Sequence, residues 1–494
     1  MAGIAGIQGA DNGELNNMLE RIKHRGPHET WINREQEINM GCCELNVGGN
    51  SKPGAHHASD GQRAIVLDGR VYNQEKADMT DAGAVLYLYD MFGTNFAQKL
   101  HGNFACAISD GDKLILARDT LGIKPLYYGH SDGKLIFASE LKSLVGISDD
   151  IKEFPPGYVY SHELGFQQYT CRAVETPEFQ SFEQARKVLA NLLAVATERR
   201  MRDNAIGGVF LSGGLDSSLI MLLAKEVKSD IEAFTVSMEG GTDLPLAQEV
   251  TKYLGVKHHV LMFSEKEIME ILPQAIHHIE MFEESCVHGA IANFLAARFV
   301  SPYTDCVLTG EGADEFLAGY DGQFRRGETP EEVACIVDLL SYVAHNTALQ
   351  RLDRLMAAHS MEARTPFVDA KVVDFSIKIP LSCKIHGEEQ IGKWILRKAF
   401  EGRLPDSIIF QSKRFFAQGS GVASIMRSLA EKHVSESELA EHNSKEENPY
   451  LSSAEELYYY RIFKETFPQP VFDHLVGRWD PTRTDFFRRH IRRV

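Results

Sequence analysis

The sequence predicts an α+β amino-terminal half built on antiparallel strands, followed by a doubly wound parallel α/β sheet with a helical carboxyl-terminal part. Three observations support this. The 494-residue chain is too long for one hydrophobic core. Early segments are short, alternating and separated by Asp-Gly turns. Later, apolar runs alternate with helical patterns. We expect domains at residues 1–175 and 176–494.

The strands expected in the first half are Arg63–Asn73, two within Gly102–Asp119, and one that opens Lys134–Leu144. Asp-Gly and Ser-Asp-Gly turns separate them, a pattern that suits an antiparallel sheet system with a few packed helices. A linker is expected at Thr176–Gln180.

The second half is expected to open with a capping box at Ser181–Gln184 and an amphipathic helix that continues through Val195. Three apolar runs then predict buried parallel strands, at Ile206–Leu211, Ile231–Val236 and Asp305–Gly310. Ligands of such sheets bind beyond the carboxyl ends of the strands. From about Thr329 onward the pattern is mostly helical.

Composition narrows the function classes. The chain is 44% hydrophobic and 24% charged, with a net charge of −17. This argues against nucleic-acid and anionic-membrane partners. No apolar stretch is long enough to span a bilayer, and the eight cysteines show no C-x-x-C pair. We therefore expect a cytoplasmic protein with reduced thiols; its oligomeric state stays open, a homo-oligomer included.

The segment Ser212–Ser218 reads SGGLDSS and joins the first parallel strand to a helix. Its adjacent glycines allow a tight turn and a close backbone approach to an anion. Free N–H groups at the helix start, with the serine hydroxyls, would face phosphates. The carboxylate of Asp216 could hold Mg²⁺. The segment is not a G-x-x-x-x-G-K-[ST] loop.

A second loop, Thr309–Phe316, ends the third parallel strand and carries acidic residues to the same sheet edge. Asp314 is the candidate second Mg²⁺ ligand. Glu311 is the candidate general base or substrate-orienting group.

Five segments occur in the order and spacing of the asparagine synthetase superfamily, which the chain resembles over nearly its whole length. They are Val209–Ser218, Val307–Tyr320, Met361–Asp369, Gly392–Phe400 and Gln411–Phe416. That superfamily includes β-lactam and carbapenam synthetases, and its phosphate loop resembles that of N-type ATP pyrophosphatases. The resemblance implies that ATP adenylates a carboxylate and that pyrophosphate leaves.

The resemblance also implies site residues. Asp216 and Asp314 would bind Mg²⁺, and Lys413 would contact phosphate and the developing oxyanion, where a cation stabilises the negative charge. The ATP site would comprise Leu211, Ser212, Gly213, Gly214, Asp216, Ser217, Val236, Gly310 and Lys393.

Glu311 occupies the base position, as in asparagine synthetases, where β-lactam synthetases have tyrosine. Glu362 has two interpretations. The simpler is an ion pair with Arg364 that braces the sheet. The other is catalytic, because in some relatives a glutamate in this part of the chain assists the tyrosine base.

The first half resembles the class II glutamine amidotransferase domain, an αββα sandwich of the Ntn-hydrolase type. His24–His28, Asp68–Asn73 and Arg118–Tyr128 carry the resemblance. Such domains use a cysteine exposed by removal of Met1, with its own amine as base. This chain has Ala2, which carries no nucleophile.

Further glutamine-binding features are missing. The family's R-L-S-I-V-D segment appears as Cys43–Gly49, its N-G-E segment as Asp68–Arg70, and its glutamine-binding aspartate aligns with Ala82. Asp68 would place negative charge where an oxyanion forms. We interpret the domain as a degenerate scaffold; the alternative is an engineered replacement at Ala2 alone.

Without glutamine hydrolysis the amine must come from elsewhere. The first hypothesis is a β-lactam synthetase-like enzyme of antibiotic or other secondary metabolism, which closes an amide within an amino-acid-like carboxylate. The second is asparagine synthetase-like amidation with ammonia or another amine. Glu284–Ala292 lacks the arginine of the family's T-T-I-R-A-S segment, which argues against aspartate. The third is a catalytically silent nucleotide-binding regulator.

Overall fold

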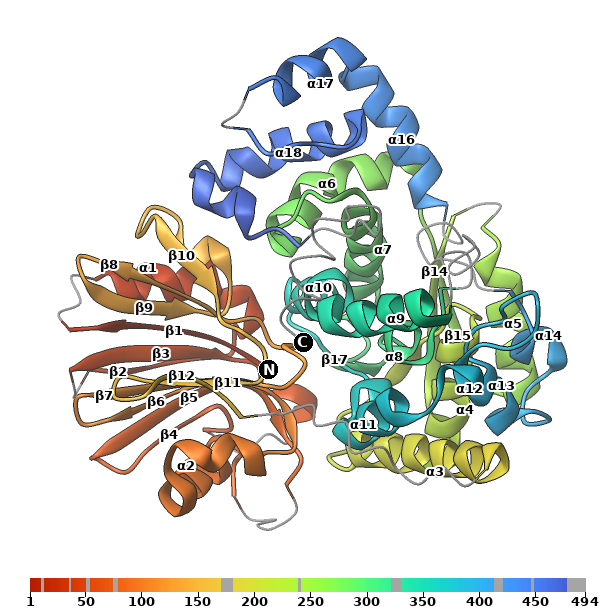
Figure 1. Ribbon diagram of the computed structural model, residues 1–494, viewed down its shortest axis with the longest axis horizontal. Coiled ribbons are helices and arrows are strands. Elements are labelled where there is room, and N and C mark those ends of the chain that lie inside the picture. Colours follow the sequence, from red (N-terminus) through yellow and green to blue (C-terminus); the bar gives the residue numbers. More distant parts are fainter. Residues whose placement is uncertain are drawn as a thin grey trace.

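The computed structural model describes residues 1–9, 13–34, 37–49, 54–73, 79–169, 181–238, 241–320, 330–412, 421–445 and 448–477. Figure 1 shows two packed bodies, a sheet-rich amino-terminal half and a parallel sheet surrounded by helices. The predicted fold class is therefore confirmed. The predicted linker at Thr176–Gln180 lies outside the described residues.

The amino-terminal half contains two antiparallel sheets with the orders β10-β8-β9-β1-β3-β2 and β12-β11-β7-β6-β5-β4. Their apolar inner faces form one core. The first sheet comprises β1 (Ala2–Gln8), β2 (Glu29–Asn33), β3 (Ile38–Glu44), β8 (Tyr127–Ser131), β9 (Lys134–Ala138) and β10 (Asp150–Glu153). The second comprises β4 (His57–Ser59), β5 (Arg63–Val71), β6 (Gly102–Asp110), β7 (Lys113–Arg118), β11 (Tyr158–Ser161) and β12 (Gly165–Gln168).

A helix covers the outer face of each sheet. α1 (Glu14–Arg21) packs on the first sheet through Leu15, Met18 and Leu19. α2 (Asp81–Phe92) packs on the second sheet, and Thr80 caps it by accepting the N–H of Gly83. The layers are thus αββα, as the resemblance implied.

The second half contains a parallel sheet with the order β15-β14-β13-β16-β17. The chain runs outward from β13 to β15, then returns to the other side of β13 for β16 and β17. The point where this direction reverses lies between β13 and β16, and ligands of open α/β sheets bind at such a point. The strands are β13 (Gly208–Phe210), β14 (Glu232–Ser237), β15 (His258–Met262), β16 (Cys306–Leu308) and β17 (Glu362–Arg364).

Helices cover both faces of this sheet. One face packs against α3 (Phe182–Met201), α4 (Leu215–Val227) and α5 (Asp243–Leu254). The other packs against α7 (Glu284–Val300) and α10 (Gln350–Ala357). Ser181 caps α3 by accepting the N–H of Gln184, at the predicted position.

The remaining helices extend the second half, and Figure 1 shows α16 to α18 stacked above α6 and α7. They are α6 (Glu265–Ile279), α8 (Ala313–Leu317), α9 (Pro330–Ala344), α11 (Ala370–Lys378), α12 (Leu381–Lys384), α13 (Trp394–Phe400), α14 (Asp406–Ile409), α16 (Val422–His433), α17 (Glu436–Asn443) and α18 (Ala454–Thr466). Among the described residues, no helix has the length and apolar character needed to cross a bilayer.

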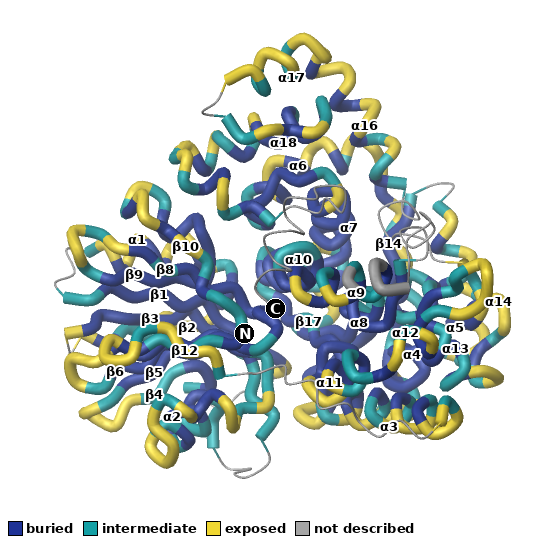
Figure 2. The backbone as a smooth tube through the Cα atoms, in the orientation of Figure 1, coloured by how far each residue is buried: buried dark blue, intermediate teal, exposed yellow. Residues whose placement is uncertain are grey.

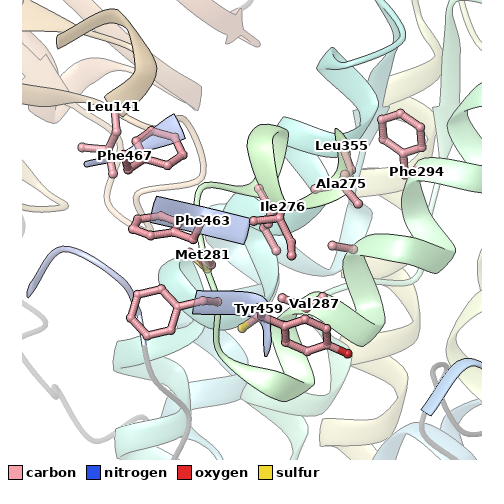
Figure 3. Packing of buried hydrophobic residues seen from close by; sticks show 14 of the residues in the cluster. Leu141, Ala275, Ile276, Met281, Val287, Phe294, Leu355, Tyr459, Phe463 and Phe467 are labelled. Carbon is pink, nitrogen blue, oxygen red and sulfur yellow. The ribbon is translucent and has the colours of Figure 1, made fainter. Parts of the chain in front are cut away.

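An apolar core joins the two halves. Figure 3 shows Leu141 of the amino-terminal half close to Phe463 and Phe467 of α18 and its carboxyl end. Ile276 and Met281 complete the contact from the second half. Figure 2 accordingly shows buried backbone on both sides of the boundary. The halves therefore fold against each other as one unit.

A charged network lies within the same boundary. Arg25 is fully buried, and its guanidinium donates to Asp68, Glu140 and Asp353 at 2.7 Å each, and to the carbonyl of Ala2 at 3.0 Å. Asp353 belongs to α10 in the second half, so the Arg25 side chain links the two halves. The network continues through Lys124, which lies 2.5 Å from Asp353.

Arg25→Met should strongly destabilise the whole chain, because it leaves buried carboxylates without their cation, a change that costs about 3–5 kcal/mol in other proteins. The measurement is the urea unfolding midpoint by circular dichroism. Arg461→Met, which removes a half-exposed partner of Glu438, is the control and should leave the midpoint nearly unchanged. Equal midpoints for the two variants would contradict this role of Arg25.

Candidate active site

The predicted phosphate loop connects β13 to α4 at the point where the chain direction reverses. Gly213 has a φ of 77°, and a Cβ there would lie 2.4 Å from the backbone nitrogen of Ala247, so the turn requires glycine. Gly214 caps α4 without a side-chain hydrogen bond. The first N–H groups of α4 thus lack a capping side chain and are suited to an anion.

Two serines fix the shape of this loop. The hydroxyls of Ser212 and Ser217 lie 3.1 Å apart, and Ser217 Oγ also accepts the N–H of Ser212 at 3.2 Å. Gly214 donates its N–H to Ser212 Oγ at 3.2 Å. These contacts hold the hydroxyl groups beside the helix start, where they can add donors to a bound phosphate.

Two aspartates share one lysine at the mouth of the loop. Nζ of Lys393 lies 2.5 Å from Oδ2 of Asp216 and 2.6 Å from Oδ1 of Asp314. Lys393 itself is only 3% exposed. Gly319 makes room for the cluster, since a Cβ there would lie 2.0 Å from Oδ1 of Asp314.

This cluster fits a divalent cation. Oδ1 of Asp216 is buried and has no hydrogen-bond partner among the described residues, and two carboxylates carry more charge than one lysine offsets. The pKa of neighbouring Glu315 reflects this negative charge: burial, then the charges of Asp314 and Glu311, raise it to about 7. Carboxylate oxygens are the ligands that Mg²⁺ prefers.

Glu311 lies beside the cluster and pairs with an arginine that sequence reasoning missed. Nη2 of Arg351, in α10, lies 2.7 Å from Oε1 of Glu311. The Nε of Arg351 is buried without a partner among the described residues. Gly289 of α7 leaves room for this side chain, because a Cβ there would lie 2.8 Å from Nη1. Only tertiary packing identifies Arg351, since it belongs to none of the motifs.

One cleft unites most of the predicted residues. Its lining includes Leu211, Ser212, Gly214, Asp216, Ser217, Val236, Gly310, Glu311, Asp314 and Lys393. Gly213 lies behind it and accepts a hydrogen bond from Gln411 at 2.9 Å. Asn293, Arg397 and Gln411 also line the cleft but were not predicted. Lys413 lies outside the described residues, two positions beyond Gln411.

Glu362 is not brought to this cleft. It is buried at the boundary between the halves, 2.6 Å from Nε of Arg364 and 3.2 Å from Nε of Arg70. Despite the desolvation that accompanies burial, the arginines hold the pKa of Glu362 well below its usual range. Its contacts are those of the structural ion pair.

The region expected to resemble a glutaminase site is filled by the protein's own charges. The buried amine of Met1 lies 3.0 Å from His56 and 3.5 Å from Glu362, and burial lowers its pKa to about 5. The N–H of Ala2 donates to Asp68 at 3.1 Å. Because Asp68 also binds Arg25, its negative charge is neutralised internally.

Ala82 is buried near the start of α2, and the residue before it carries a carboxylate that sequence reasoning passed over. Asp81 lies 3.5 Å from Arg70, which also binds Glu362. The carboxylate nearest to the predicted glutamine-binding position is therefore already paired.

The chain matches two protein-family models. The asparagine synthase family model matches residues 188–334 and 323–479, and the glutamine amidotransferase domain model matches residues 1–201. Glutamine-hydrolysing asparagine synthetase of Triphysaria versicolor is 30% identical over 489 residues, covering 92% of this chain and 83% of that protein. Glutamine-hydrolysing asparagine synthetase B of Escherichia coli (strain K12) is 30% identical over 488 residues, covering 91% and 87%.

Among solved structures, glutamine phosphoribosylpyrophosphate amidotransferase from B. subtilis is 15% identical and covers 53% of this chain and 81% of that chain. The TM-score is 0.29, too low to carry an argument.

Lys393→Met should tighten Mn²⁺ binding about tenfold or more in nucleotide-free protein, because the metal would no longer displace a buried ammonium group from Asp216 and Asp314. Asp314→Asn should weaken it. Electron paramagnetic resonance of free Mn²⁺ measures both. Weaker binding by Lys393→Met would show that the lysine does not compete with a metal.

Proposed function

Because the chain belongs to the asparagine synthetase family, we propose that it forms an amide from an amino-acid-like carboxylate, using ATP, Mg²⁺ and an external amine. Ammonia is the simplest such amine. The observation that carries the proposal is a contrast: the cleft keeps its phosphate loop and paired aspartates, whereas the amidotransferase site is filled by internal ion pairs.

The cleft offers an apolar part for the base of ATP and a glycine-serine loop for its phosphates. Apolar Leu211, Val236 and Leu246 line one part of it, and the loop before α4 lines another. Asp216 and Asp314 would hold Mg²⁺, which when bound neutralises charge on the phosphates. Lys393, freed from the aspartates, would then have phosphate oxygens within its reach, as the family match for this lysine implies.

The substrate carboxylate would lie near Glu311 and Arg351. A carboxylate paired with a guanidinium suits the ammonium and carboxylate groups of an amino acid, because each group finds its opposite charge. The buried Nε of Arg351 supplies a donor not used within the described residues. On α7, where the family arginine is absent, His288 instead hydrogen-bonds Glu455.

An external amine is favoured because the amino-terminal half has no nucleophile at Ala2, and buried charged pairs lie in the boundary between the halves. The cavity at the boundary is about 20 Å³ and is lined by charged groups including Arg70, Lys124 and Asp353. Leu352 lines both this cavity and the cleft.

Closure of a lactam ring, placed first by the sequence analysis, ranks second here. The relatives reported above are asparagine synthetases, and Glu311 replaces the tyrosine of the β-lactam branch. The catalytically silent alternative is disfavoured by the buried, unpartnered oxygen of Asp216 in the cleft.

Incubation with ATP, Mg²⁺, ¹⁵NH₄⁺ and each of a panel of amino-acid carboxylates, aspartate included, should give a labelled amide and pyrophosphate with at least one of them, whereas [¹⁵N-amide]glutamine should give no label and no glutamate. Mass spectrometry and a pyrophosphate assay measure these products, with Asp314→Asn as the inactive control.

Label transferred from glutamine would contradict the external-amine proposal. Pyrophosphate release with loss of water from a β-amino acid, without added amine, would favour ring closure. No pyrophosphate with any carboxylate would favour the silent regulator.

A further inference from the structure

A second cluster of metal-ligating side chains lies in the amino-terminal half, away from the cleft. Cys42 and Glu44 are two residues apart on β3 and point to the same face, because side chains alternate along a strand. His57, the first residue of β4, faces them. One ligand atom from each side chain lies within 4.8 Å of the other two.

One oxygen of the buried Glu44 carboxylate lacks a hydrogen-bond donor among the described residues. Its Oε1 accepts the N–H of His56 at 3.1 Å and lies 2.7 Å from Nδ1 of His57. Its Oε2 is buried and has no hydrogen-bond partner among the described residues. Among the described residues, the one ion-pair partner of Glu44 is His57. A fully buried carboxylate without a permanent cation costs several kcal/mol, so a bound cation would relieve it.

The three side chains match a known ligand class. Thiolate, imidazole and carboxylate are the groups that bind Zn²⁺, at about 2.0–2.3 Å from the metal. Tetrahedral ligands at such lengths are roughly 3.3–3.5 Å apart. Sγ of Cys42 lies 3.9 Å and Nδ1 of His57 lies 2.7 Å from Oε1 of Glu44, so each of these two separations needs to change by roughly 0.5 Å. Zn²⁺ with one thiolate and one carboxylate is also neutral overall.

We propose that Cys42, Glu44 and His57 bind a zinc-class divalent ion, with Oε2 of Glu44 or a water molecule as the fourth ligand. On binding, the Cys42 thiol loses its proton to solvent and the sulfur binds the metal. The His57 side chain is 16% exposed and provides an entry path. Trp31 stacks on the His57 ring at 4.5 Å and fixes its orientation.

The site joins the two sheets, because β3 lies in the first and β4 in the second. Its ligand Glu44 belongs to Cys43–Gly49, the segment that stands where the family has its glutamine-carboxylate-binding residues. Burial, then the charge of Glu44, raise the pKa of the Cys42 thiol well above its usual range.

The test is a Co²⁺ titration of the full-length, metal-stripped protein, followed by absorbance, with the zinc content of the protein as purified. We expect one Co²⁺ per chain to give a thiolate-to-cobalt charge-transfer band that Zn²⁺ removes. Co²⁺ bound by the oxygen ligands Asp216 and Asp314 gives no such band. Cys42→Ser should abolish the band, and His57→Ala should weaken binding at least about tenfold.

Cys43→Ser is the matched control, because Cys43 is adjacent but faces α1, with its Sγ 3.4 Å from the carbonyl of Leu19. It should keep the band. Circular dichroism checks that each variant is folded. If Cys42→Ser does not fold, the test rests on His57→Ala, which changes a partly exposed side chain. Absence of the band in the wild type, or its loss in Cys43→Ser but not in Cys42→Ser, would overturn the proposal.

Discussion

The buried guanidinium of Arg25 is the contact on which the arrangement of the two halves depends. Removing an arginine from water is expensive, and the expense is offset only when every donor finds a good acceptor. Here three carboxylates and a carbonyl provide acceptors. Although burial alone would lower its pKa, Asp353, Asp68 and Glu140 together raise the pKa of Arg25 well above its usual value.

The same contact supports the proposal that the amino-terminal half is a degenerate scaffold. Asp68 stands where the family places an oxyanion-stabilising amide, and Arg25 neutralises it. Arg70 stands beside it and is occupied by Glu362 and Asp81. A glutamine molecule would have to displace these buried pairs. The cleft follows the opposite pattern, since Lys393 leaves Asp216 and Asp314 with excess negative charge that a metal can use.

Much of the fold follows from local sequence signals. The strand predicted at Ile206–Leu211 is β13, Gly208–Phe210, and the phosphate loop follows it as expected. The predicted residues of this loop and of the acidic loop converge because both follow parallel strands, whose carboxyl ends share one edge. These features depend on residues close together in the chain.

Pairings between distant residues could not be predicted in this way. Asp353 lies 328 residues from its partner Arg25, and α10 gives no signal of which polar residue faces the other half. Packing of α7 and α10 likewise places Asn293 in the lining of the cleft and brings Arg351 to Glu311. Glu362 was identified from a motif, but its position in the motif does not tell whether the carboxylate contacts substrate or pairs with arginines.

The most direct measurement is glutamate release from glutamine by an Ala2→Cys variant with Met1 removed, so that a cysteine with a free amine is terminal. If the site is lost as a whole, the restored nucleophile should give no glutaminase activity, since Asp68, Arg70 and Arg25 still fill the region. Glutamine hydrolysis at a rate that supports amide formation would contradict this, and would show that Ala2 is the single lesion in an otherwise competent domain.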